Sequence, residues 1–176
     1  LFAALASTSC RMPQGSEVQR LDSPLTIDLS KGLNDSLWVK NGGDWEVEGN
    51  VLRSRGGENR YPIWLARSVP DSFELHFEAR ADSAAVDHKV EFCADGVRHE
   101  SGYVAILGGW SNSLAVIARQ DEHEKARTEK KGHWETRRWY HWTVRRTVRA
   151  GTGTIEWLLD GKPFMTRRDP KPLTGK

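Results

Sequence analysis

The side chains from Phe73 to Arg80 alternate strictly between apolar and polar, in the order FELHFEAR. Successive side chains of a β-strand point to opposite faces of its sheet, so this segment predicts a strand with one buried and one solvated face. Residues 140–148 and 154–159 repeat the alternation. Because no long window has a sustained helical period, the chain is expected to be all-β.

Turn-forming residues divide the rest of the chain into short runs with strand character. Asp160-Gly161 is a two-residue hairpin signal, since both residue types tolerate positive φ. Residues 120–132 are highly charged without an apolar stripe, and they are expected to be a solvated hairpin loop. Many short strands with regular turns are typical of an antiparallel β-sandwich or barrel, and we favour the sandwich. Further strands are predicted at 26–30, 45–48, 50–55, 62–67, 88–93, 103–107 and 113–119.

The 176 residues divide into a short leader and one domain. Residues 1–10 are mainly apolar and end in small residues before Cys10. They resemble the end of a secretory signal peptide, or a bacterial lipobox whose cysteine becomes lipidated; the remaining alternative is a buried segment with no targeting role. Residues 11–24 are expected to be a polar tether and residues 25–176 the sandwich. This organisation predicts a secreted protein or a cell-envelope lipoprotein, attached to a membrane only through lipid on Cys10.

Cys93 is the second of two cysteines. If Cys10 carries lipid, Cys93 is expected to be a buried thiol, and a Cys10–Cys93 disulfide is the alternative. At the other end of the chain, residues 170–176 are turn-like and no strand follows them. A sandwich normally has strands near both termini, so we expect a closing strand to be missing, which would leave an unpaired edge.

Four segments of the chain resemble parts of a known family of domains. They are GDWEVEGNVL at 43–52, SFELHFEAR at 72–80, the stretch from Gly108 to His123, and residues 142–175 with the run WLLDGKPF. Together they resemble bacterial concanavalin A-like, laminin-G-type jelly-roll domains of the 3-keto-disaccharide hydrolase family, a group of unknown function. The resemblance implies a jelly roll with an extracellular, glycan-related role. It supplies no catalytic residues that can be transferred to this chain.

The row Glu74, His76 and Glu78 is the sharpest catalytic candidate. Alternate residues of one strand lie about 6–7 Å apart on one face. Two carboxylates at such a spacing could serve as acid/base and nucleophile in glycoside cleavage. Family 16 glycoside hydrolases carry a similar row with an acidic residue in the middle, where this chain has a histidine. The alternative is the polar, outward face of an ordinary strand.

A second group of residues predicts a binding site. A tryptophan at a hairpin tip offers a flat apolar face to a sugar ring, and nearby amide and charged groups can hydrogen-bond its hydroxyls. The alternatives are a tryptophan folded back on the sandwich and a solvated charge cluster. The group consists of Trp110, Asn112, Arg119, Asp121, Glu122 and His123.

The overall charge does not point to nucleic acid. The formal net charge is only +2, and the basic residues between Lys130 and Arg149 fall on both strand faces and on loops. The histidines lack a metal-ligand spacing, so no catalytic metal is predicted, although a structural Ca²⁺ near Asn34 and Asp35 would suit the fold.

Three functional hypotheses follow from these observations. The first is a module that binds a glycan or oligosaccharide, and it is favoured because aromatic and polar binding groups are plentiful. The second is a carbohydrate-active, glycosidase-like hydrolase that uses the charged face of the strand. The third is a structural or adhesion module.

Overall fold

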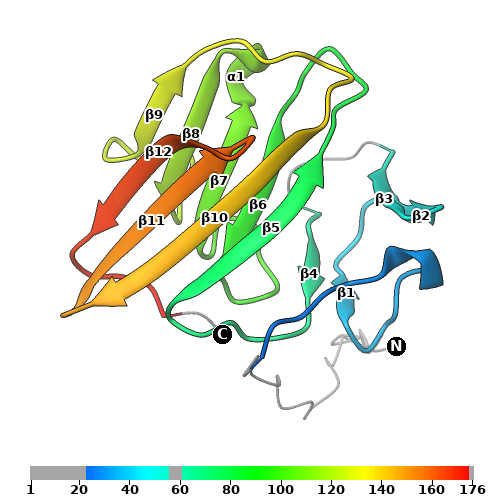
Figure 1. Cartoon of the computed structure of the whole chain (residues 1–176), viewed down its shortest axis with the longest axis horizontal. Helices are drawn as coiled ribbons and strands as arrows, with labels where there is room; N and C mark the ends of the chain where they lie inside the picture. The colour runs from blue at the N-terminus through cyan, green and yellow to red at the C-terminus, as the bar shows by residue number, and fades with distance from the viewer. Residues whose placement is uncertain (1–22, 56–60, 175–176) are drawn as a thin grey trace, which may run out of the picture.

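The computed structural model describes residues 23–55 and 61–174 (Figure 1). Apart from a 3₁₀ turn η1 (Leu29–Lys31) and one short turn α1 (Gly109–Asn112), the regular elements within these ranges are strands. They are β1 (Trp38–Lys40), β2 (Trp45–Glu48), β3 (Val51–Ser54), β4 (Ile63–Leu65), β5 (Phe73–Ala79), β6 (His88–Phe92), β7 (Tyr103–Gly108), β8 (Leu114–Arg119), β9 (Thr128–Lys131), β10 (Tyr140–Arg149), β11 (Thr152–Leu159) and β12 (Lys162–Asp169).

Two four-stranded antiparallel sheets form the body of the domain (Figure 1). The first sheet has the strand order β12-β11-β10-β5, and the second has the order β6-β7-β8-β9. Two small antiparallel pairs, β1-β4 and β2-β3, come from the N-terminal part of the described chain. The predicted all-β, antiparallel sandwich is therefore confirmed.

The core lies between the inner faces of the two sheets and is rich in aromatic rings. Trp142 of β10 stacks on Trp157 of β11 with 4.2 Å between ring centroids. Phe77 stacks on the other side of Trp142, and the ring edge of Phe164 meets Trp157. The predicted alternation of β5 is confirmed, since its aromatic and aliphatic residues pack on this core while the intervening ones are exposed.

The second sheet is also covered on its outer face. Its central strands carry outward apolar side chains that are fully buried, namely Val104, Ile106, Val116 and Ala118. Strands buried on both faces read as continuous apolar runs, which explains the sequences YVAILG of β7 and LAVIAR of β8. Trp110 packs against this outer cluster.

The connection between β8 and β9 differs from the predicted solvated hairpin loop. Residues 128–131 form strand β9 at the edge of the second sheet. Residues 120–127 turn back to the outer face, where Glu122 pairs with Lys89 of β6 and the Arg127 guanidinium lies 4.7 Å from the ring centroid of Trp110. The predicted hairpin is thus confirmed in its connection, whereas the placement of residues 128–131 in the loop was wrong, since they pair with β8.

Smaller differences occur near the N-terminus of the described chain. The strand predicted at 26–30 is replaced by η1, whose first turn is capped by the Asp28 carboxylate, an acceptor from the Ser30 backbone N–H at 3.0 Å. The Asn34 side chain likewise caps a turn by accepting from the Ser36 backbone N–H. The predicted Asp160-Gly161 hairpin is confirmed, with positive φ at both positions.

Cys93 is a buried free thiol, and burial raises its pKa. The predictions for residues 1–22, including lipidation of Cys10, lie outside the described residues. Within the described ranges, no helix has the length and apolar character that a membrane span requires.

His88 of β6 provides a pH test of this packing. Its ring lies among the core aromatics, with centroids 6.3 Å from Tyr140 and 6.5 Å from Trp142. Burial lowers its pKa from 6.5 to about 4. The unfolded chain therefore takes up a proton between these pH values while the folded protein does not. We expect the free energy of unfolding to fall by up to about 3 kcal/mol from pH 7 to pH 4 through this residue.

Urea unfolding at a series of pH values measures this effect. His88→Leu should flatten the profile between pH 6.5 and pH 4 relative to the wild type, whereas the exposed control His141→Gln should leave it unchanged. The same slope in His88→Leu as in the wild type would contradict the assignment.

Candidate functional site

A shallow pocket of about 240 Å³ lies over the outer face of the second sheet. Its walls come from the start of β6, from the turn between β7 and β8, and from the segment that follows β8. The lining residues are Asp87, Lys89, Gly109, Trp110, Glu122 and His123. Three of the predicted binding residues, Trp110, Glu122 and His123, are therefore brought together.

Trp110 stands on a strained turn. Its backbone φ is 51°, and the two residues that follow it, Ser111 and Asn112, also have positive φ. Such conformations cost of order 1 kcal/mol or more for non-glycine residues and persist only where the surrounding structure enforces them. Gly108, which precedes the turn, could not carry a side chain, because a Cβ there would lie 2.5 Å from Cβ of Val86.

Asn112 holds this turn in place. Its side chain is buried, its amide nitrogen donates to the Trp134 carbonyl at 2.8 Å, and its amide oxygen accepts from the Trp134 backbone N–H at 3.1 Å. Both the nitrogen and the oxygen of this amide are therefore hydrogen-bonded within the protein. Asn112 is therefore a support for the turn and does not line the pocket, and its predicted contact with a ligand stays a prediction.

The pocket combines an aromatic wall with close charges. The Lys89 ammonium lies 2.8 Å from Glu122 Oε2 and 3.8 Å from Asp87 Oδ1. Burial raises the pKa of Asp87, and the negative charge of Glu122 adds to that rise. The His123 ring meets Trp110 edge-on at a centroid distance of 5.4 Å. This arrangement can hold a small polar molecule that has one apolar face.

Arg119 does not belong to the pocket. It continues the inward side of β8, opposite Tyr103 of β7, and its guanidinium forms an ion pair with Asp169 of β12 at 3.1 Å. The structure therefore does not bring Arg119 together with Trp110, and its predicted contact with a ligand stays a prediction. Asp121 has a local role, because its carboxylate accepts from the His123 backbone N–H at 2.8 Å.

Sequence reasoning missed Asp87 and Lys89. They come about 20 residues before Trp110 and reach it only because β6 pairs with β7 in the register His88↔Leu107. The signal that could have found them is the alternation in HKVEF, which puts Lys89 and Glu91 on the face opposite the core residues Val90 and Phe92.

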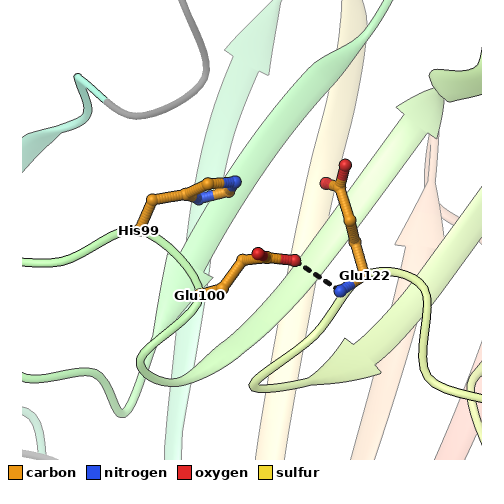
Figure 2. A group of neighbouring side chains, drawn as sticks. All are labelled: His99, Glu100 and Glu122. Carbon is orange, nitrogen blue, oxygen red and sulfur yellow. Dashed lines mark hydrogen bonds between the residues drawn. The ribbon is translucent and has the colours of Figure 1, made fainter.

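A group of possible metal ligands adjoins the pocket. His99 and Glu100 lie in the loop between β6 and β7, and their side chains approach Glu122 (Figure 2). One ligand atom from each residue lies within 4.8 Å of the others. The Glu100 carboxylate also accepts from the Glu122 backbone N–H at 2.5 Å, which ties the two loops together.

The catalytic candidates on β5 lie on the outer face of the other sheet. Glu74 accepts from the Arg145 guanidinium at 2.5 Å and lies 2.7 Å from His76. The hydrogen bond from Arg145 lowers the pKa of Glu74, which makes it a poor proton donor near neutrality. Glu78 sits opposite His141 on the same open face. None of the three β5 residues lines the Trp110 pocket. A further hollow lies on the first sheet, and these three do not line it either; its lining residues are Thr147, Arg149, Thr152, Thr154, Glu156 and Arg168.

Comparison with known proteins supports the fold of this chain but assigns it to no family. No protein-family model matches the sequence, and no curated protein matches it. Among solved structures, the carbohydrate-binding module CBM66 from Bacillus subtilis is similar, with a TM-score of 0.58 and 16% sequence identity over 75% of this chain and 79% of that one. This likeness agrees with the β-sandwich. The resemblance to the 3-keto-disaccharide hydrolase family finds no matching family model.

The supporting role of Asn112 predicts a large loss of stability on Asn112→Ala. The substitution leaves a buried N–H and a buried carbonyl of Trp134 unpaired and puts alanine at a positive φ, so we expect a loss of about 2–3 kcal/mol in urea unfolding. Asn41→Ala is the matched control, because that exposed amide makes a single bond to the Val97 carbonyl, and it should cost less than about 1 kcal/mol. Equal losses in the two variants would refute the supporting role.

Proposed function

We propose that this domain binds carbohydrate non-covalently in the Trp110 pocket. The observation that carries the proposal is the combination of a tryptophan wall with two carboxylates and an ammonium group in one hollow. Sugars present an apolar ring face between rims of hydroxyls, and such a pocket matches both parts. The similarity of the fold to a carbohydrate-binding module supports the same class of ligand.

In this proposal, Trp110 packs against the ring of a sugar while Asp87, Lys89 and Glu122 hydrogen-bond its hydroxyls. The strained turn and its anchor fix the indole before the ligand arrives, which reduces the ordering cost of binding. The apolar leader ending at Cys10 supports a secreted or lipid-anchored location, where glycans are accessible.

Glycoside hydrolysis is a second candidate function. Its site would be the Trp110 pocket and not the charged face of β5. Asp87 and Glu122 both line the hollow, and burial raises the pKa of Asp87 in the direction that a general acid needs. Lys89 lies between the two carboxylates, however, and neutralises part of their charge. Binding without turnover is therefore the favoured function.

Removal of the tryptophan wall tests the proposed binding. A glycan array with the wild-type domain identifies a ligand, and titration calorimetry then compares variants. Trp110→Ala should weaken binding by at least about 10-fold, since the ring contact is lost. Trp139→Ala is the matched control, because Trp139 is exposed, also carries an arginine over its ring, and is not part of the pocket. Equal effects of both variants, or no glycan bound at all, would refute the proposal.

Incubation with the oligosaccharides that bind distinguishes the two candidates. We expect no new reducing ends by chromatography after prolonged incubation, and we expect Asp87→Asn to alter only affinity, by about 10-fold or less. Product release by the wild type that Asp87→Asn abolishes would instead establish a hydrolase at this pocket.

A further inference from the structure

Three side chains beside the pocket have the composition of a metal site. His99 contributes an imidazole, and Glu100 and Glu122 contribute carboxylates, from two loops that meet over the outer face of the second sheet (Figure 2). Their ligand atoms lie within 4.8 Å of one another, close enough for a single ion to contact all three after small side-chain adjustments. This is not a solvated acidic patch, since the side chains of His99 and Glu122 are only 16% and 14% exposed.

His99 and Glu122 each keep one side-chain atom that is available to coordinate an ion. Nδ1 of His99 contacts Glu91 Oε1, which leaves Nε2 for an ion. Lys89 binds Oε2 of Glu122, while Oε1 of that residue forms, among the described residues, one ion-pair contact, with the His123 ring nitrogen at 3.6 Å. An ion could therefore use Nε2 of His99 and Oε1 of Glu122 without displacing Lys89.

Glu91 supports the group from behind. Its side chain is 7% exposed; one oxygen contacts the His99 ring and the other accepts from the Glu100 backbone N–H at 2.9 Å. Metal-binding histidines characteristically place their second nitrogen against a carboxylate, which fixes the ring and makes it a better ligand. Glu91 holds two of the three proposed ligand residues in this way.

The charge balance also favours a cation. Asp87, Glu91, Glu100 and Glu122 place four carboxylates around this part of the sheet, and Lys89 is the permanent cation that contacts them. Arg127 pairs with the Glu129 carboxylate at 3.0 Å and meets Glu122 at its backbone carbonyl, 2.9 Å away, rather than at its carboxylate. A divalent ion would compensate the remaining negative charge where burial makes that charge costly.

We infer that His99, Glu100 and Glu122 form a binding site for a divalent transition metal, of the zinc type, beside the Trp110 pocket. One imidazole with two carboxylates suits Zn²⁺, whereas Ca²⁺ prefers a larger set of oxygen ligands. A protein set of three ligands leaves a further coordination position for water or a ligand group. The inference does not depend on the proposed sugar binding, although Glu122 belongs to both sites.

Zinc titration of the untagged, EDTA-treated protein tests the inference. We expect one high-affinity equivalent by calorimetry and a rise in melting temperature with Zn²⁺. Glu100→Gln should weaken zinc binding by at least about 10-fold while keeping the side-chain oxygen that accepts from the Glu122 backbone. His99→Gln should do the same. The matched controls His141→Gln and Glu156→Gln lie on the outer face of the other sheet and should bind zinc like the wild type.

Zinc affinity that is unchanged in both His99→Gln and Glu100→Gln would overturn the site, and so would tighter binding of Ca²⁺ than of Zn²⁺. Glycan titrations on the same variants keep the two proposals separate. Loss of zinc binding in Glu100→Gln with glycan binding retained supports the metal site alone. A wild-type domain that binds glycan but no zinc overturns only the metal site.

Discussion

The stack of Trp142 on Trp157 lies at the centre of the core between the two sheets of this domain. The rings come from neighbouring strands of the first sheet, and Phe77 and Phe164 extend the aromatic layer toward both edges. Residues on the inner faces of β7 and β8 pack against this layer. Because aromatic side chains bury large areas with few rotatable bonds, they give the sandwich a fixed thickness on which the outer face of the second sheet is built.

The pocket depends on a contact that crosses between the sheets. Arg167 of β12 is buried, and its guanidinium reaches Glu124 at 2.9 Å and the Ala126 carbonyl at 3.2 Å. Both partners lie in the segment between β8 and β9 that carries Glu122. The first sheet thus anchors the segment that carries Glu122 and His123, through a strand that does not itself line the Trp110 pocket.

Local patterns predicted most of the strands, although not β1, β9 or β12, and they did not predict how the strands pair. β5, β10 and β11 were predictable because each carries its alternation within itself. The direction of Arg119 was not, because both faces of β8 are apolar and nothing in LAVIAR shows which face meets the core. Trp110 was recognisable as a turn tryptophan, whereas Lys89 joins it only through strand pairing. The strand β9 was missed because its residues, TEKK, have no apolar stripe.

Trp110 combines a strained backbone with a packed side chain. A glycine would adopt φ near 51° without steric cost, so the chain keeps a bulky ring at a position where its backbone favours the smallest residue. Replacement by glycine would relieve the backbone strain, but it would also remove the packing of the indole on the apolar outer cluster and its contact with Arg127. The stability of such a variant would therefore report the balance between backbone strain and side-chain packing at this one position.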